Sequence, residues 1–206
     1  MLIKIDPEKP QEQFIKWVAE ILRKGGVIAC PTDTVYGIGC DMFNSEGLER
    51  IYRIKNIPRS KPLSFICADL RDLSQYAQVS NSGYKIMKRL LPGPYTFILR
   101  ASRQVPRVMM THQRTVGIRV PSNDICLALV KELGRPIVST SAAVTANEVL
   151  SDPVEIDQKF GTLLNLVIDG GILVSDPSTI IDLTDDEHVE VLREGKGDIS
   201  SLLAKR

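Results

Sequence analysis

The chain has 206 residues, of which 43% are hydrophobic and 25% are charged, and its formal net charge is +1. These values are ordinary for a globular protein with a substantial core, and they exclude the disordered and collagen-like classes. A chain with so little net charge is not a polycation, so any phosphate or nucleic acid that it binds has to contact a local basic patch.

Near the N-terminus, apolar residues recur at the spacing of one face of a helix. They are Phe14, Trp17, Val18, Ile21 and Leu22. Pro10 lies near the expected start of this helix, and Gly25 and Gly26 end it. The pattern predicts an amphipathic helix whose apolar stripe, including Trp17, faces the core.

The rest of the chain alternates between extended and helical patterns. The predicted strands are VIAC (27–30), PLSFICA (62–68), YTFILRA (95–101), TVGIRVP (115–121), PIVSTS (136–141), LNLVIDGG (164–171), STIIDLT (178–184) and VEVLREG (189–195). The predicted helices begin with Ser45 as a cap, at Ser80, at Asp124, at Ser151 and at Asp198, the last of them ending at Ala204.

Strands that recur between helices are typical of an α/β protein. The last strands are too close together along the chain for parallel crossovers, so we predict a mixed sheet. No linker or internal repeat divides the chain. Residues 1–206 therefore read as a single-domain α/β fold, a mixed sheet with helices on both sides.

No apolar run approaches the roughly 18 residues that a membrane-spanning helix needs, and the N-terminal segment lacks the apolar stretch of a secretory signal. We therefore expect a cytoplasmic protein with no membrane partner and with reduced thiols. The cysteines form no C-x-x-C pair and are expected to be buried; they are Cys30, Cys40, Cys67 and Cys126. With only His112 and His188 present, no metal site is predicted.

Four segments place hydroxyls, glycine or basic residues where a predicted strand begins or ends. They are PTDTVYG (31–37), RIKNIPRSKP (53–62), VSTSAA (138–143) and PSTIIDLT with REGKG (177–184 and 193–197). Open α/β sheets bind their ligands at strand ends, and hydroxyls, free N–H groups and cations suit a phosphate or a carboxylate. The same segments can equally be a turn, a solvated basic face and an edge strand.

Two arginines lie in strands that are otherwise apolar. Arg119 is part of VGIRVP, and Arg193 is part of VLREG. An arginine in such a strand is seldom buried without an anionic partner. No Walker A loop and no G-x-S-x-G elbow is present, so the residues alone predict an α/β domain with an anion pocket.

Seven ordered segments together resemble the YrdC/YciO family, from about residue 10 to residue 199. They are GGVIACPTDTVYGIGCD, RIKNIPRSKPLSFIC, LPGPYTFIL, VGIRVP, STSA, PSTIIDL and REGKGD. The segments FICADL and VPSNDICLALVKELG are most similar to the YciO-like branch. The resemblance implies a YrdC/RibB-like fold, in which a twisted mixed sheet surrounds a concave basic cavity.

The resemblance also implies an activity. Active members of the family join L-threonine, bicarbonate and ATP into L-threonylcarbamoyl-adenylate for tRNA modification, and they release pyrophosphate. ATP would be a substrate here, and Mg²⁺ would be carried by its phosphates. Transfer RNA or another RNA, and a second copy of the chain in a homodimer, are the further partners to consider.

The site residues follow from the matching segments. The resemblance makes Lys55, Arg59 and Ser141 catalytic, and the same three residues with Arg193 would bind the nucleotide. The implied substrate-binding residues are Thr32, Thr34, Tyr36, Lys61, Arg119, Ser139 and Ser178. Arg119 would pair with the carboxylate of threonine.

Two positions depart from the pattern of active members, which usually carry K-x-R in the basic loop and S-x-N after the hydroxyl strand. Ile57 occupies the arginine position and Ala143 the asparagine position. A lost charge-assisted partner of a phosphate costs ~1.5–3 kcal/mol of binding. Three functions stay open: a slow synthase, a protein that binds RNA or nucleotide without synthesis, and an ATP-using enzyme with another acceptor.

Overall fold

The computed structural model describes residues 1–106, 109, 113–145, 148–174, 176–185 and 188–203. Its helices are α1 (Glu12–Arg23), α2 (Ser45–Lys55), α3 (Leu70–Tyr76), α4 (Asn81–Leu90), α5 (Asp124–Leu133), α6 (Pro153–Phe160) and α7 (Ser200–Leu203). Its strands are β1 (Leu2–Lys4), β2 (Ile28–Cys30), β3 (Gly37–Asp41), β4 (Ser64–Ile66), β5 (Ala77–Gln78), β6 (Tyr95–Ala101), β7 (Thr115–Arg119), β8 (Ile137–Ser141), β9 (Ala143–Thr145), β10 (Glu148–Val149), β11 (Leu166–Asp169), β12 (Thr179–Asp182) and β13 (Glu190–Arg193).

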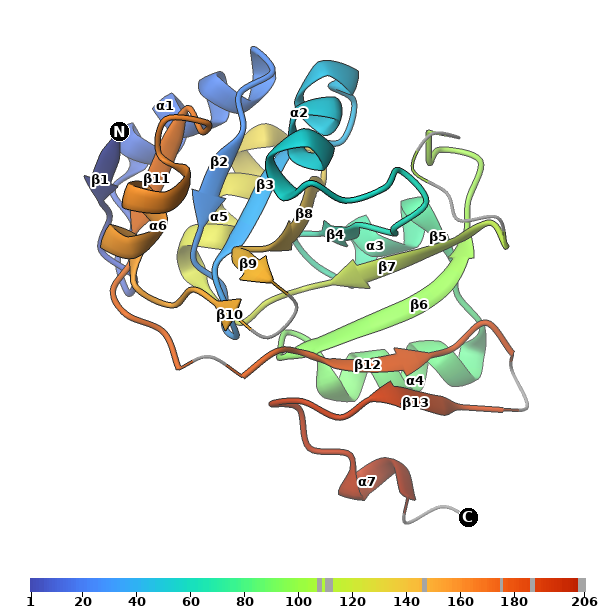
Figure 1. Cartoon of the computed structure of the whole chain (residues 1–206). Helices are drawn as coiled ribbons and strands as arrows, with labels where there is room; N and C mark the ends of the chain where they lie inside the picture. Colours follow the sequence, from blue (N-terminus) through green and yellow to red (C-terminus); the bar gives the residue numbers. More distant parts are fainter. Residues whose placement is uncertain (107–108, 110–112, 146–147, 175, 186–187, 204–206) are drawn as a thin grey trace.

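One twisted sheet organises the molecule (Figure 1). Its strand order is β1-β11-β2-β3-β8-β4-β7-β6-β12-β13, with β5 paired to β6, while β9 and β10 form a separate pair. The sheet contains both parallel pairs, such as β4 with β7, and antiparallel pairs, such as β3 with β8. The predicted mixed α/β sheet is therefore confirmed, and all eight predicted strands are present.

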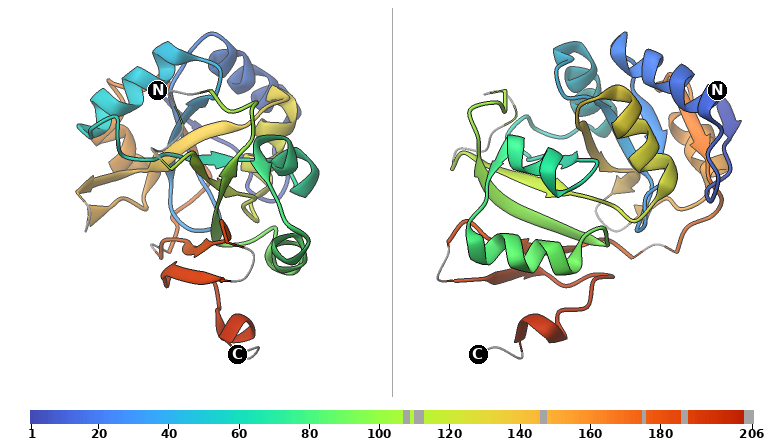
Figure 2. Two further views of the ribbon diagram at one scale, coloured as in Figure 1. Left: turned by 90° about the vertical axis from the view of Figure 1, so that its right-hand side faces the viewer. Right: turned by 180° about the vertical axis from the view of Figure 1, so that it is seen from behind.

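Alternate residues of the strands enter two apolar clusters, one on each face of the sheet. In β8, Ile137 packs with the cluster that α1 and α5 cover, whereas Val138 belongs to the larger cluster that takes in residues of α2, α3, α4 and α6. Because side chains along a strand point alternately to opposite faces, helices cover both sides of the sheet, as predicted. The rear view in Figure 2 shows α1 lying beside α5. No helix in the described ranges is long and apolar enough to cross a bilayer.

One detail of each of the first two predicted helices is wrong. Trp17 is 37% exposed, because the stripe of α1 that faces the core is Ile15, Val18, Ala19 and Leu22. That set follows the spacing i, i+3, i+4 and i+7, which places Trp17 off the buried face. The cap of α2 is Asn44, whose side chain accepts a hydrogen bond from the Gly47 amide at 2.8 Å, and Ser45 is the first helical residue.

The sequence patterns did not predict several short elements, among them β1, β3, α3, β9 and β10. Strand β3 has the sequence GIGCD, and glycine is a weak signal for a strand. Gly39 is required there because a Cβ atom would lie 2.8 Å from Cγ2 of Ile137 on β8. The last helix begins at Ser200 rather than at Asp198, and its predicted end, Ala204, is outside the described residues.

Candidate functional site

The register of the central strands aligns small and polar residues on one face of the sheet. Ser139 of β8 is opposite both Gly39 of β3 and Ser64 of β4. Ser64 is opposite Gly117 of β7, and Gly117 is opposite Ile98 of β6. Paired positions project to the same face, so these residues form one continuous strip across four neighbouring pairs of strands.

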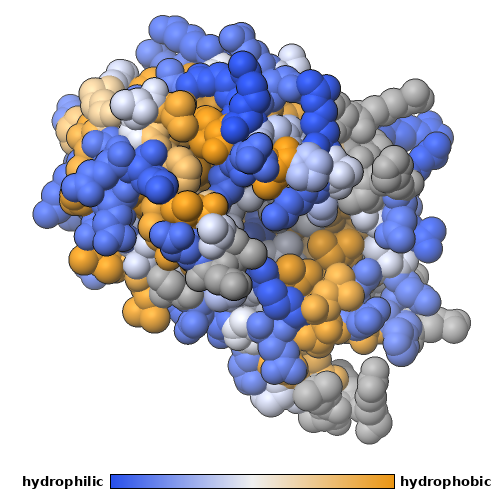
Figure 3. Space-filling view, in the orientation of Figure 1, coloured by the Kyte–Doolittle hydropathy of each residue, from blue (hydrophilic) through white to orange (hydrophobic). Residues whose placement is uncertain are grey.

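The strip is low because two of its five members, Gly39 and Gly117, are glycines. A Cβ atom on Gly117 would lie 3.3 Å from Oγ of Ser64 and 3.4 Å from Cγ2 of Thr96. One end of the same face, at Ile66 and Ile137, is packed under α5. In the space-filling view of Figure 3 the surface is hollowed near its centre, in the region where Figure 1 shows β8, β4 and β7 meeting.

The loop between β2 and β3 is held by its own hydroxyls. Oγ1 of Thr32 donates to the Val35 carbonyl at 2.6 Å and accepts from the Thr34 amide at 3.1 Å, and both threonines are buried. Tyr36 donates from its hydroxyl to the Gly171 carbonyl at 2.8 Å, and burial raises the pKa of this phenol. These hydrogen bonds fix the conformation of the loop and connect it to residues 170–171.

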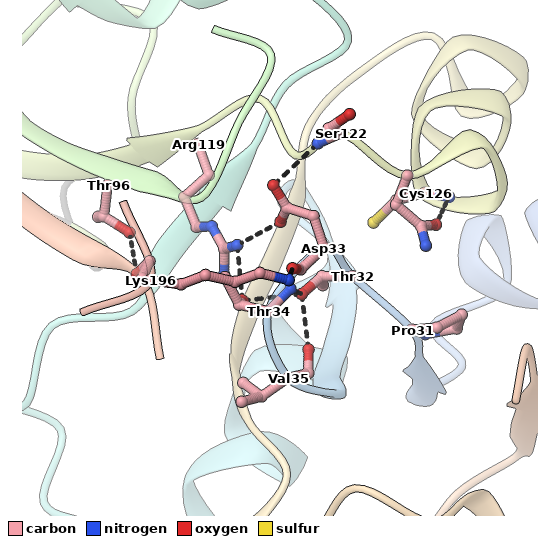
Figure 4. A network of polar contacts seen from close by, with 12 residues as sticks. Pro31, Thr32, Asp33, Thr34, Val35, Thr96, Arg119, Ser122, Cys126 and Lys196 are labelled. Carbon is pink, nitrogen blue, oxygen red and sulfur yellow. Dashed lines mark hydrogen bonds and ion pairs between the residues drawn. The ribbon is translucent and has the colours of Figure 1, made fainter. Parts of the chain in front are cut away.

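Arg119 and Asp33 form the centre of a polar network, which Figure 4 shows. One guanidinium nitrogen of Arg119, Nη2, donates to Oδ1 of Asp33 and to Oγ1 of Thr34, both at 2.8 Å. The second oxygen of Asp33 accepts from the Ser122 amide at 3.0 Å, and its carbonyl accepts from Lys196 at 2.6 Å. The side chains of Arg119 and Asp33 are only 10% and 8% exposed, and the buried Nε of Arg119 has no hydrogen-bond partner among the described residues.

A second arginine lies close to this network. Arg193 donates from Nε and Nη2 to the Ser178 carbonyl at 3.1 and 2.7 Å, and Oγ of Ser178 is 2.8 Å from Oγ1 of Thr96. Burial lowers the pKa of Arg193, and the positive charge of Arg119 lowers it further. The two guanidinium groups therefore repel each other, and an anion between them would be stabilised by both.

The basic residues at the end of α2 and just after it have different partners. Lys55 donates from Nζ to the Ala143 carbonyl and lies over the ring of Phe160, with Nζ 5.8 Å from the ring centroid. Burial, and to a smaller extent the charge of Lys61, lowers the pKa of Lys55 to about 8. Arg59 instead forms an ion pair with Glu49 at 2.6 Å, and its side chain is 71% exposed.

The structure thus brings the implied site residues together in two groups. The first contains Thr32, Thr34, Arg119, Ser178 and Arg193. The second contains Lys55 and Lys61 near Ala143, together with Ser141 of β8, which lies two positions before Ala143; Ser139 belongs to the strip. Arg59 belongs to neither group, since it points to Glu49 on α2. The roles that the family pattern gives these residues stay predictions.

Four further residues reach the site although the sequence pattern did not single them out. They are Asp33, Ser64, Thr96 and Lys196. Asp33 and Lys196 lie inside quoted motifs, where charge alone could have marked them as partners for an arginine and a carbonyl. Ser64 and Thr96 are ordinary strand residues, and only the pairing register places Ser64 on the strip and Thr96 beside Gly117.

Replacing Lys55 with methionine should raise the free energy of unfolding at pH 7 by about 1 kcal/mol, because the change removes a desolvated cation; partial exposure makes this less than the full pKa shift implies. The unfolded chain holds this proton up to its ordinary pKa near 10.5, and the folded protein releases it near 8. The gain should therefore be complete below pH 8 and disappear toward pH 10.5. Urea unfolding across this range measures it.

The matched control is Arg53→Met, which removes an exposed cation from the same helix. It should change the free energy of unfolding by less than about 0.5 kcal/mol at every pH. Equal effects of the two substitutions would show that Lys55 carries no special electrostatic penalty.

Known proteins resemble this chain over nearly its whole length. The sequence model Sua5_yciO_yrdC, described as telomere recombination, matches residues 20–195. YciO of Escherichia coli is 44% identical over 97% of both chains, and its crystal structure superposes with a TM-score of 0.92 over 97% of this chain and 98% of that one.

Two relatives carry names that state an activity or a ligand. A putative threonylcarbamoyl-AMP synthase of Methanocaldococcus jannaschii is 32% identical over 91% of this chain and 88% of its own length. The crystal structure of Pyrococcus abyssi Sua5 complexed with L-threonine is 30% identical and has a TM-score of 0.92, covering 99% of this chain and 60% of that one.

Proposed function

The chain belongs to the Sua5–YciO–YrdC family, and from this premise we propose that it joins L-threonine, bicarbonate and ATP into L-threonylcarbamoyl-AMP and releases pyrophosphate. The observation that carries the proposal is the pair Arg119 and Arg193, two partly desolvated cations beside the hydroxyls of Ser178 and Thr96. The named synthase and the threonine complex among the relatives support it.

Arg119 binds the threonine carboxylate in this proposal. Asp33 and Thr34 both bond to Nη2 of its guanidinium, and in the part of the chain that the structure describes the buried Nε has no partner. An unpaired buried donor costs about 1–3 kcal/mol, and a carboxylate oxygen would recover part of this cost. Asp33 then acts as a positioning residue, since it holds Arg119 and is itself held by the Ser122 amide.

The chemistry needs charge neutralisation more than a strong base. The threonine amine combines with bicarbonate to give a carbamate and water, and a carbamate oxygen attacks the α-phosphate as pyrophosphate leaves. Lys55, Lys61 and Arg193 stabilise the phosphate oxygens, and Ser141 donates a hydrogen bond. Mg²⁺ carried by the phosphates adds charge neutralisation; in the described part of the chain no cluster of three or more His, Cys, Asp or Glu side chains offers it a separate site.

A second candidate, binding of RNA without synthesis, is favoured by a different observation. Residues 73–123 contain no Asp or Glu, but they include Lys85, Lys88, Arg89, Arg100, Arg103, Arg107, Arg114 and Arg119. The residues of this set that are exposed in the described ranges are Lys85, Lys88, Arg89, Arg100, Arg103 and Arg114. A surface with many cations and no neighbouring acids on the same segment suits a phosphate backbone.

Pyrophosphate release measures the first candidate directly. We expect release from the complete mixture, and a loss of it when either L-threonine or bicarbonate is left out. Release that continues without threonine would mean that the chain uses ATP with another acceptor. Absence of release, together with salt-sensitive binding to duplex RNA, would favour the second candidate over the first.

A further inference from the structure

Two of the four buried thiols lie side by side beneath the β2–β3 loop. Cys30 ends β2 and Cys126 lies in the first turn of α5, and their Sγ atoms are 4.0 Å apart although 96 positions separate them in the sequence. Cys40 and Cys67 are also buried, and neither has a sulfur–sulfur contact in the described residues. The close pair is therefore a specific feature of this part of the fold.

The two cysteines lie on the same two segments that the polar network of the site connects: the end of β2 with its following loop, and the start of α5. Cys30 directly precedes the loop that carries Asp33, and Asp33 accepts from the Ser122 amide just before α5. Asn123, the cap of α5, accepts from the Cys126 amide at 3.0 Å. In Figure 4 the thiol of Cys126 points toward the chain that holds Pro31 and Asp33.

We propose that Cys30 and Cys126 form a reversible disulfide that weakens the binding of threonine at its end of the site. The effect on threonine binding rests on the proposed function, whereas the formation of the bond does not. A peroxide is the oxidant. The sulfur of Cys30, as thiolate, attacks one peroxide oxygen and the O–O bond breaks; the hydroxide that leaves takes up the proton released by the thiol, so the products are a sulfenic acid and water. The sulfur of Cys126 then attacks Sγ of Cys30, and the sulfenic oxygen leaves as water with the remaining proton.

The bond requires movement, and the movement reaches Arg119. A disulfide is ~2.05 Å long, so the sulfur atoms have to approach each other by about 2 Å. This draws the end of β2 toward α5 and shifts Asp33, which is bonded to both Arg119 and Ser122. The hydrogen bond to Cys126 and burial raise the pKa of the Cys30 thiol, so the oxidation should become faster as the pH rises.

The test treats the full chain with hydrogen peroxide near pH 8 and blocks remaining thiols with iodoacetamide. Peptide mass mapping should find the Cys30 peptide linked to the Cys126 peptide, with the loss of two hydrogens. The melting temperature should rise by several degrees, because the bond closes a long loop in the unfolded chain. The affinity for L-threonine should fall about tenfold and recover with dithiothreitol.

Cys30→Ala and Cys126→Ala should abolish the cross-link and the loss of affinity, whereas Cys40→Ala and Cys67→Ala should preserve both. Absence of the cross-link in the unsubstituted chain would overturn the proposal, and so would a cross-link that leaves threonine affinity unchanged. If the reduced protein binds no L-threonine, the proposed function fails, and the cross-link and the melting temperature still test the thiol pair.

Discussion

Replacing Arg119 with methionine should lower the free energy of unfolding by about 3 kcal/mol and abolish the binding of L-threonine. The substitution leaves the carboxylate of Asp33 buried at 8% exposure with the Ser122 amide as its remaining partner. Breaking one side of a buried ion pair costs ~3–5 kcal/mol, and the remaining amide bond keeps the cost near the lower limit. For a chain of this length the melting temperature should fall by about 6–12 °C.

Arg135→Met is the matched control for this prediction. Arg135, in the connection between α5 and β8, forms a bidentate ion pair with Asp41 at the end of β3. Asp41 is 1% exposed. The control should lose a comparable part of the stability but keep threonine binding, measured by calorimetry at low temperature where both variants are folded. Retention of threonine binding by Arg119→Met would show that this arginine serves the fold alone.

The double substitution Ile57→Arg with Ala143→Asn should increase the rate of pyrophosphate release about tenfold or more, because each restored group is worth ~1.5–3 kcal/mol to a bound phosphate. The structure shows what occupies these positions instead. Ile57 packs against the main apolar cluster, and Ala143 is 7% exposed with its carbonyl bound to Lys55. The gain should appear in steady-state release at ATP concentrations well below saturation, where tighter binding of the phosphates raises the rate, with some loss of stability from the packing of Ile57.

Ile54→Arg is the control for the added charge. Ile54 also packs against the main cluster, and it lies about one helical turn before Ile57. It should reduce stability without raising the rate. Equal rates for the double substitution, the control and the unsubstituted chain would show that these two positions do not limit activity.

The sequence was most informative where the periodicity of a segment matched its burial. Strand β6 has the bounds that its β-branched and aromatic run predicts, and α5 ends at the glycine that the pattern identified. The pattern was least informative for strands that are short or contain glycine, because neither feature gives a clear strand signal. Strand β3 reads GIGCD because β8 approaches its backbone closely, and that neighbour is almost 100 residues away in the chain.

The sequence predicted the motifs of the candidate site but not how their residues are arranged in space. An arginine in an apolar strand predicted an anionic partner, and Asp33 is that partner inside the protein. Ser64 and Thr96 carry no local signal, since the place of Ser64 on the strip and of Thr96 beside Gly117 depends on strand register. The orientation of Arg59 toward Glu49 depends on where α2 ends, at Asn56 in a left-handed conformation, and no motif encodes that turn.

The ties of the β2–β3 loop also bear on how the protein is made. Tyr36 is held by Gly171, which is 135 residues away, and Asp33 is held by Lys196, which is 163 residues away. On the ribosome, the loop emerges early but cannot acquire these ties until Gly171 and Lys196 have been translated as well. The loop therefore reaches its final geometry long after its own residues have been made, and shorter nascent chains carry it in an unanchored form.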